Sequence, residues 1–163
     1  MLRTRASNEA GETHRESGLK GSTMTEPLMI RGQPRRSTAM ALLQSQGLPV
    51  SDITEDLLQH FFFVGPDGSP TGLVGLEIHG TDALLRSLVV CETARDRRLG
   101  SALGDHAEHY AASRSVTSIY LLTSTAESFF RHLGYERIDR SQAPSSIKAT
   151  LEFASLCPAN SAS

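Results

Sequence analysis

Apolar residues recur along this chain with two periods, and the two periods predict strands and helices in alternation. Short apolar runs are typical of strands, whereas apolar residues at positions i, i+3, i+4 and i+7 are typical of amphipathic helices. The predicted strands span residues 28–31, 60–64, 73–79, 84–90, 118–123 and 135–139. The predicted helices span residues 37–47, 51–58, 99–111, 126–134 and 144–156, with Ser51 or Asp52 as the cap of the second.

The order of these elements predicts the fold class. The turn Gly80-Thr81-Asp82 joins two strands closely, so these strands form an antiparallel hairpin. A long helix separates the strand at 84–90 from the strand at 118–123, and this unit requires a parallel, right-handed crossover. We therefore expect an α/β fold with a mixed, mainly antiparallel sheet flanked by helices, and not a doubly wound parallel sheet.

The two ends of the chain differ in composition from its middle. Residues 1–26 are rich in Arg, Glu, Ser, Thr and Gly, which predicts a disordered or upstream extension. Met24 is a plausible alternative start, in which case residues 1–23 would be an artefact; a basic regulatory tail is another interpretation. The domain itself is expected over residues 27–157, with a frayed tail at 158–163.

Composition restricts the classes of partner that we expect for the protein. The 163 residues suit one domain, and the net charge of −2, from 16 basic and 18 acidic residues, does not favour nucleic acid. No apolar run approaches the roughly 20 residues that span a bilayer, and the polar N-terminus is not a secretory signal. Cys91 and Cys157 fit neither a disulfide framework nor a metal site, and the histidines match no compact metal spacing. We expect a cytoplasmic protein with two free thiols, no metal and no membrane partner.

The stretch from residue 84 to 111 combines a strand, a basic loop and a helix. Arg95, Arg97 and Arg98 lie in the loop, and the helix that begins near Leu99 presents free backbone N–H groups at the same point. Positive charge beside a helix N-terminus favours an anion. The stretch therefore predicts a phosphate site.

Two motifs resemble the GNAT superfamily of acetyl-CoA-dependent N-acetyltransferases. Residues 95–100 are similar to its phosphate loop R/Q-x-x-G-x-G/A, with Arg98 at the first glycine. Residues 123–135 are similar to its N-x-x-A-x-x-L-Y-x-x-x-G-F motif, with Thr123 in place of Asn and Phe130 in place of Tyr. The resemblance implies a GNAT-like fold, whose parallel strand–helix–strand unit binds acetyl-CoA, and direct acetyl transfer within a ternary complex.

The resemblance also implies where acetyl-CoA binds. The loop from Arg95 to Ser101 would hold the pyrophosphate, and the free edge of the strand at 88–90 would pair with the pantetheine arm. A backbone N–H at Val90-Cys91 would stabilise the oxyanion. If the loop needs a positive φ at residue 98, arginine is disfavoured there. The expected cofactor-binding residues are Leu88, Val89, Val90, Arg95, Arg97, Arg98, Leu99, Gly100, Ser101, Thr123 and Phe130.

Acetyl transfer needs a neutral amine, and therefore a base or a water chain that takes its proton. Glu77, a carboxylate inside the central strands, is the predicted base; a solvated strand residue is the alternative. Arg86, with Ser87, is the predicted clamp for a substrate anion, because guanidinium binds planar anions bidentately; a surface arginine is the alternative. An even-length hairpin loop would bring Glu77 and Arg86 to one face, and an odd-length loop would separate them.

The thiolate that leaves coenzyme A needs a proton, and Phe130 cannot donate one. Ser124 is the predicted donor, with Thr125, Ser128 or water as alternatives. Cys91 lies beside the expected acetyl site, so a covalent acetyl-cysteine is the alternative to direct transfer.

Four short segments, 74–77, 85–88, 121–123 and 152–158, resemble arsenic-resistance N-acetyltransferases. That resemblance implies a small amino-acid-like substrate, such as the glutamate analogues arsinothricin or phosphinothricin. Acetylation of a protein or peptide amine is the alternative activity. A non-catalytic protein that binds acetyl-CoA or trivalent arsenic is the alternative without catalysis, although two thiols are few for arsenic. The protein would be a monomer or a homodimer.

Overall fold

The computed structural model of the protein describes residues 1–6, 29–123, 125–150 and 153, except the side chains of Asp96 and Arg97. The strands are β1 (Leu2–Arg5), β2 (Arg31–Gly32), β3 (Phe61–Val64), β4 (Gly72–His79), β5 (Asp82–Val90), β6 (Ser118–Leu121) and β7 (Glu136–Arg137). The helices are α1 (Arg36–Ser45), α2 (Glu55–Leu58), α3 (Leu99–Ser113), α4 (Glu127–His132) and α5 (Ser145–Lys148), with 3₁₀ turns at Glu92–Arg97 and Arg140–Gln142. None of these helices is both long and apolar enough to cross a membrane.

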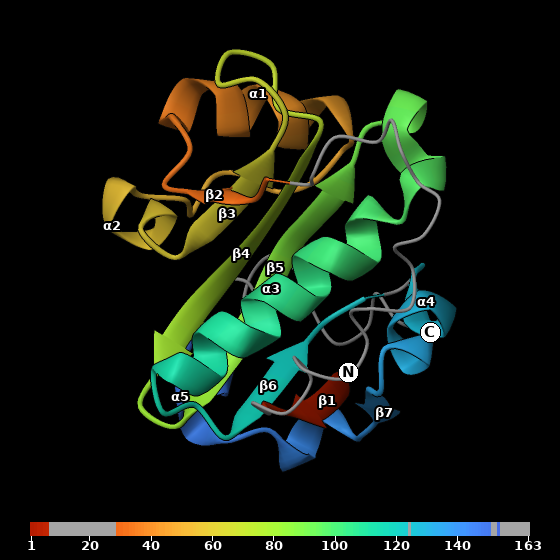
Figure 1. Ribbon diagram of the computed structural model, residues 1–163. Coiled ribbons are helices and arrows are strands. Elements are labelled where there is room, and N and C mark those ends of the chain that lie inside the picture. Colours follow the sequence, from red (N-terminus) through yellow and green to blue (C-terminus); the bar gives the residue numbers. More distant parts are fainter. Residues whose placement is uncertain (7–28, 124, 151–152, 154–163) are drawn as a thin grey trace.

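The described strands form one sheet in the order β2-β3-β4-β5-β6-β1-β7 (Figure 1). β5 and β6 run parallel, and every other neighbouring pair is antiparallel. The helix α3 connects β5 to β6, which is the crossover that a parallel pair requires. The predicted mixed, mainly antiparallel sheet is therefore confirmed.

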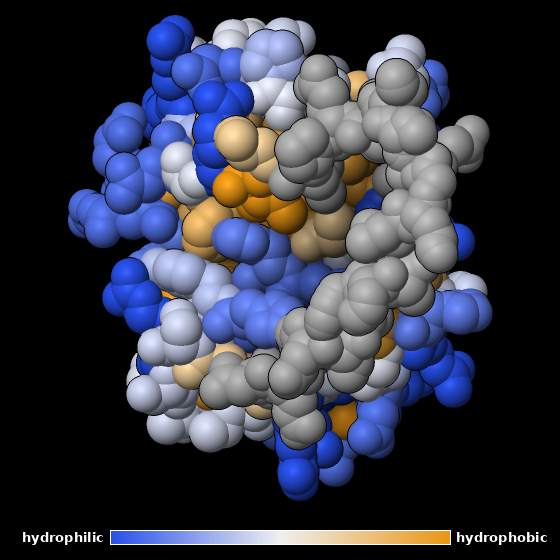
Figure 2. Space-filling view, viewed as in Figure 1, coloured by the Kyte–Doolittle hydropathy of each residue, from blue (hydrophilic) through white to orange (hydrophobic). Residues whose placement is uncertain are grey.

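Helices cover both faces of the sheet, because alternate residues of each strand point to opposite sides. Leu103 and Ala107 of α3 pack on the first face, in a core that includes Val74 and Leu85. The second face carries two smaller cores, one under α1 and the other, around Leu84, under α5. Seen from the side of α3, the surface is largely hydrophilic, and hydrophobic residues gather over strands that α3 leaves uncovered (Figure 2).

The N-terminal strand β1 corrects an expectation. The prediction that residues 1–26 lie outside the folded domain is wrong for Leu2–Arg5, which pair with β6 on one side and β7 on the other. Leu2 is 1% exposed, but the other three residues are not buried. Backbone pairing with two neighbours therefore holds a strand that has almost no apolar pattern. Residues 7–28 and the tail at 158–163 lie outside the described residues.

Other elements also differ in their bounds from the predictions. The strand expected over 28–31 is reduced to Arg31–Gly32, and the helix expected over 144–156 is described only at Ser145–Lys148. The helix expected over 51–58 begins at Glu55, and its cap is Thr54, whose hydroxyl accepts a hydrogen bond from the backbone N–H of Leu57. Asp52 lies before this helix and has a different partner.

A β-bulge in β5 shapes the centre of the sheet. Gly75 of β4 pairs with Arg86, but Leu73 pairs with Val89, so β5 carries one extra residue opposite Val74. Ser87 lies in this extra stretch with a φ of 62°. A bulge bends a strand and increases its twist. The pairing of β5 with β6 ends at Leu84, just before the bulge.

Candidate active site

A cleft opens where β5 and β6 diverge. The two strands pair only as far as Leu84 and Tyr120, and a cavity of about 180 Å³ lies beyond this point. Its walls come from β5, from the segment that follows β6, and from the loop between α1 and α2. The cleft residues are Leu48, Pro49, Leu85, Arg86, Ser87, Leu88, Leu121, Leu122, Thr123, Thr125, Ala126 and Phe130.

A second cavity, called the loop cavity below, has a volume of about 320 Å³ and shares Leu88, Ala126 and Phe130 with the cleft. The other residues that line it are Val89, Val90, Arg95, Arg98, Gly100, Ser101 and Phe129. The two cavities adjoin, so they link the basic loop before α3 to the diverging strands. Of the other predicted cofactor-binding residues, Thr123 lines the cleft and Leu99 lines neither cavity, while the side chain of Arg97 lies outside the described part of the chain.

The backbone at the start of α3 is suited to hold an anion. Arg98 has a left-handed conformation with a φ of 60°, and α3 begins at Leu99 without a hydrogen bond from a capping side chain. The N-cap residue therefore offers the first N–H groups of this 15-residue helix no side-chain acceptor. The helix dipole adds positive potential at the same place. The conflict that we expected between arginine and a positive φ at residue 98 is present.

Arg95 ties the basic loop to the rest of the fold. Its Nε donates to the carbonyl oxygen of Val90 at 3.0 Å, and its Nη2 donates to Oε1 of Gln46 at 2.7 Å. The guanidinium thus joins the loop to the end of β5 and to the end of α1, while it also lines the loop cavity. Leu99 is 7% exposed and packs in the core, so its contribution to an anion site is limited to its backbone.

The oxyanion donor expected at Val90-Cys91 is corrected in part. The backbone N–H of Cys91 donates to the carbonyl oxygen of Thr71 at 2.9 Å. This donor is therefore already used within the fold, because Cys91 continues the pairing of β5 with the segment before β4. Its thiol lies 3.3 Å from the hydroxyl of Thr93, and Cys91 lines neither of the two cavities.

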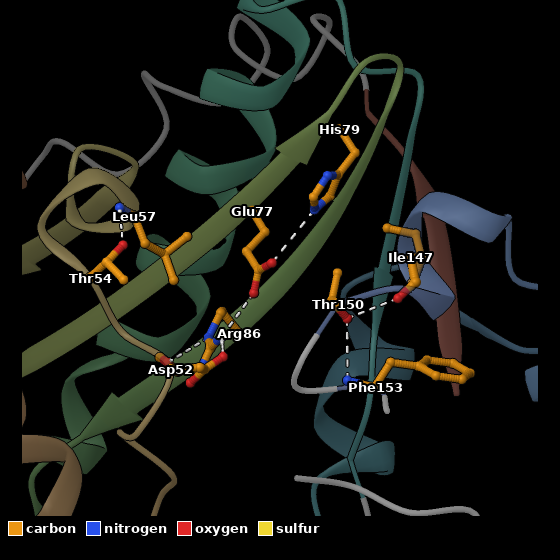
Figure 3. A network of polar contacts seen from close by, with 10 residues as sticks. Asp52, Thr54, Leu57, Glu77, His79, Arg86, Ile147, Thr150 and Phe153 are labelled. Atoms are coloured by element: carbon orange, nitrogen blue, oxygen red, sulfur yellow. Dashed lines mark hydrogen bonds and ion pairs between the residues drawn. The ribbon is translucent and has the colours of Figure 1, made fainter. Parts of the chain in front are cut away.

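A buried ion cluster lies beside the cleft, and Figure 3 shows its members. The side chain of Arg86 is fully buried and donates to both carboxylate oxygens of Asp52, with Nη2 at 2.8 Å from Oδ1. Nη1 also donates to Oε2 of Glu77 at 2.8 Å, and Nε donates to the hydroxyl of Ser87 at 3.3 Å. Two carboxylates thus share one guanidinium, and Arg86 reaches the cleft with its charge already balanced.

Glu77 and Arg86 lie on one face because the hairpin loop has an even length. His79 pairs with Asp82, which leaves the two residues Gly80 and Thr81 in the turn. Glu77 lines a side cavity of about 320 Å³ together with Asp52, Thr54, Asp56, Leu57, His60, Ile78 and His79. It does not line the cleft. A base role for Glu77 therefore stays a prediction.

The sequence singled out Asp52 only as a possible helix cap, and the structure places it against Arg86. A buried arginine requires a carboxylate partner, but the two residues are 34 positions apart. No periodicity connects them, so no sequence signal could have found the pair.

The predicted proton donors lie in different places. Ser124 lies outside the described residues, and Thr125 lines the cleft. The hydroxyl of Thr123 accepts hydrogen bonds from the backbone N–H groups of Thr125 and Ala126, at 3.3 and 2.9 Å. Ser128 lines a separate depression on α4.

Two phenylalanines close the loop cavity against α4. Phe130 is 6% exposed and lines both the cleft and the loop cavity. Phe129 packs edge to face against it, with ring centroids 5.0 Å apart. A Cβ on Gly100 would lie 3.2 Å from Cζ of Phe129, so glycine at this position lets α4 approach the start of α3. Among the described residues, no group of three or more His, Cys, Asp or Glu is arranged to hold a metal ion.

Comparison with known proteins agrees with this arrangement. The family model of the acetyltransferase (GNAT) domain matches residues 58–137. An uncharacterised N-acetyltransferase of Chlorobaculum tepidum is 26% identical over 106 residues, which are 63% of this chain and 68% of that protein.

Two solved structures share the fold. N-acetylglutamate synthase from Neisseria gonorrhoeae, complexed with coenzyme A and N-acetyl-glutamate, has a TM-score of 0.66 at 19% identity over 77% of this chain. The match covers 32% of the synthase, so this chain spans about a third of its length. Rv2747 from Mycobacterium tuberculosis, in complex with CoA, has a TM-score of 0.58 at 20% identity, over 73% of this chain and 78% of that one. The matched residues 58–137 include β4 and β5, the basic loop, α3 and α4, so this part of the chain is an acetyltransferase (GNAT) domain.

Proposed function

We propose that this protein transfers the acetyl group of acetyl-CoA to the amino group of a small, amino-acid-like molecule, by direct transfer in a ternary complex. The observation that carries the proposal is the junction of the loop cavity and the cleft at Leu88, Ala126 and Phe130. If the thioester of acetyl-CoA lies at this junction, the phosphates of the coenzyme lie in the loop cavity and the acceptor amine lies in the cleft. Proximity of this kind lowers the barrier of a two-substrate reaction.

The residues around the loop cavity fit acetyl-CoA. The first N–H groups of α3 and the side chain of Arg98 would bind the pyrophosphate. The edge of β5 past Leu84 has no partner strand in β6. Amides of the pantetheine arm would pair with this edge as another strand does.

The reaction needs two proton transfers. The amine nitrogen attacks the thioester carbon, the carbon–sulfur bond breaks, and coenzyme A leaves as a thiolate. The proton lost by the nitrogen goes to a base or to water, and the thiolate takes a proton from water or from a hydroxyl such as that of Ser124 or Thr125. Glu77 lies outside the cleft, so it would act as the base only through an intervening water.

The acceptor is a small molecule in this proposal. The cleft volume of about 180 Å³ is below the roughly 300–1,000 Å³ of sites for drug-sized ligands. Ser87 would contact the polar end of the acceptor, beside the guanidinium of Arg86 that Asp52 and Glu77 already bind. The resemblance of four short segments to arsenic-resistance N-acetyltransferases puts arsinothricin and phosphinothricin among the candidates, and glutamate is their natural counterpart. A cytoplasmic location is part of the same prediction.

The experiment is acetyl-CoA turnover, measured as free thiol release with arsinothricin, phosphinothricin, glutamate, other amino acids and a lysine peptide. Ala126→Phe would fill the junction, and Ala149→Phe, on the exposed end of α5, is the matched control. We expect turnover with at least one small amine, lost in Ala126→Phe and kept in Ala149→Phe. Release with no amine contradicts the enzyme proposal, and a preference for the lysine peptide contradicts the small acceptor.

A further inference from the structure

The loop between α1 and α2, residues 47–54, reaches the cleft at one end and the buried ion cluster at the other. Leu48 and Pro49 line the cleft. Three residues further on, the carboxylate of Asp52 is 5% exposed and binds the guanidinium of Arg86 with both oxygens. One short loop thus forms a wall of the cleft and also carries Asp52, the main partner of Arg86. Among the described residues, Arg86 is the only buried arginine.

The loop has further attachments, because Leu48 and Val50 pack against the core under α1. Ile53 is 2% exposed in the core under α1, and Thr54 caps α2. The backbone N–H of Leu48 donates to the carbonyl oxygen of Leu43 at 2.9 Å, which continues from the end of α1. Between these two anchors, Asp52 supplies the hydrogen bonds that tie the loop to Arg86 of β5 (Figure 3).

We propose that Asp52 is a positioning residue for the acceptor amine. Through its two hydrogen bonds with Arg86 it holds loop 47–54 against β5, so that Leu48 and Pro49 close the acceptor side of the cleft. Arg86 is the fixed point of this attachment, since Glu77 and Ser87 hold the guanidinium from β4 and β5. The inference rests on the proposed acetyl transfer.

The geometry separates the acceptor from the cofactor. No residue of loop 47–54 lines the loop cavity, whose described residues come from β5, the basic loop, α3 and α4. Loosening loop 47–54 therefore opens the cleft and leaves the acetyl-CoA site in place. Water would enter the opened cleft and compete with the amine for the thioester.

The first test is the kinetics of Asp52→Asn and Asp52→Ala. We expect the KM for the acceptor to rise about tenfold while the KM for acetyl-CoA changes less than about twofold. We also expect acetyl-CoA hydrolysis without acceptor to increase. Asp56→Asn is the matched control, because Asp56 is an exposed carboxylate of the same side cavity with no ion pair among the described residues, and it should leave all three values unchanged.

Removing one partner of a buried ion pair destabilises the fold, so the Asp52 variants could fail to fold. A second variant therefore tests the proposal with the ion pair intact. Leu48→Ala changes the wall of the cleft without touching the buried charges, and it should raise the acceptor KM in the same direction. Hydrogen exchange gives an independent reading: the amides of residues 48–53 should exchange faster in Asp52→Asn than in wild type, and those of residues 98–103 should not.

The outcomes are distinct. If the wild type is active and Asp52→Asn and Leu48→Ala lower only the melting temperature, with unchanged KM values and exchange, Asp52 is merely structural and the inference is wrong. The inference is also wrong if the KM for acetyl-CoA rises as much as the KM for the acceptor. If the wild type turns over no amine, the proposed function fails, and the positioning role fails with it.

Discussion

The carboxylate of Glu77 and the guanidinium of Arg86 meet at 2.8 Å between neighbouring strands. Glu77 pairs with Leu84, so Arg86 is its diagonal neighbour two residues along β5. Only the two-residue turn between β4 and β5 gives this register, because a shift of one residue would send one of the two side chains to the opposite face. The contact places Glu77 on Arg86 and not in the cleft.

Glu77→Gln separates its two possible roles. Because Glu77 does not line the cleft, we expect kcat/KM to fall about tenfold with an unchanged shape of the pH–rate profile, as for a residue that acts through another. The measurement is the pH–rate profile of wild type and variant. If kcat/KM instead falls more than about a hundredfold and the acidic limb of the pH–rate profile disappears, Glu77 is the base.

Arg98 is held in a conformation that costs an arginine free energy. We expect Arg98→Gly to raise the free energy of unfolding by about 0.5–1 kcal/mol, after deduction of the greater chain entropy that glycine gives the unfolded state. The same variant should raise the KM for acetyl-CoA about threefold to tenfold, because one cation near the phosphates is lost.

Arg98→Ala is the matched control for this change. It removes the same charge but keeps a Cβ at positive φ, so it should raise the KM without stabilising the fold. Denaturant unfolding and acetyl-CoA saturation curves give both numbers. An unchanged KM in both variants would show that the side chain of Arg98 does not contact the cofactor.

The strand β1 is predicted to contribute to stability although it is rich in polar residues. Leu2 is 1% exposed in the main core, so Leu2→Ala should lower the free energy of unfolding by about 2–3 kcal/mol. Thr4, in the same strand, donates one exposed hydrogen bond to the carbonyl oxygen of Gly134, and Thr4→Ala should cost about 0.5 kcal/mol or less. Equal effects of the two variants in urea unfolding would argue against β1 as part of the sheet.

Glu108 on α3 makes the stability depend on pH. Burial, with Asp105 close by, raises the pKa of Glu108 from about 4.5 to about 7. The folded protein therefore binds more protons than the unfolded chain between these values, and stability falls as the pH rises through this window.

Glu108→Gln should remove this slope. At pH 4 the variant and wild type should be almost equally stable, and at pH 8 the variant should be more stable by about 1 kcal/mol, a value reduced because the carboxylate is only partly buried. The exposed Glu136→Gln is the control, and urea unfolding at both pH values is the measurement. A stability difference that does not change with pH would contradict the assignment to Glu108.

The elements around the cleft could be predicted because their patterns are local. The apolar run at 84–90, the basic residues after it and the helical spacing from Leu99 lie within one continuous stretch. Together they predicted the parallel crossover and most residues of the loop cavity, while the phosphate site stays a prediction. The turn at Gly80 also narrowed the register of Glu77 and Arg86 to two cases, of which the structure has the even one.

The parts that could not be predicted depend on long-range contacts. β1 is held mainly by backbone pairing with β6 and β7, and Leu2 alone is too little for an apolar pattern in its sequence. Asp52 finds Arg86 across 34 residues, and the N–H of Cys91 is used by Thr71. Each of these contacts exists only once the sheet is assembled. The last two also determine which side chains and backbone N–H groups are still able to bind a substrate or cofactor.

The central claim is that the junction at Leu88, Ala126 and Phe130 brings an acetyl thioester to a small amine. The most direct measurement follows the acetyl group of isotope-labelled acetyl-CoA into the acceptor by mass spectrometry, with wild type, Ala126→Phe and Ala149→Phe in parallel. We predict label on the amino nitrogen of a small amino-acid-like acceptor with wild type and Ala149→Phe, and none with Ala126→Phe. Label on no small amine, or equal labelling by Ala126→Phe, would contradict the account.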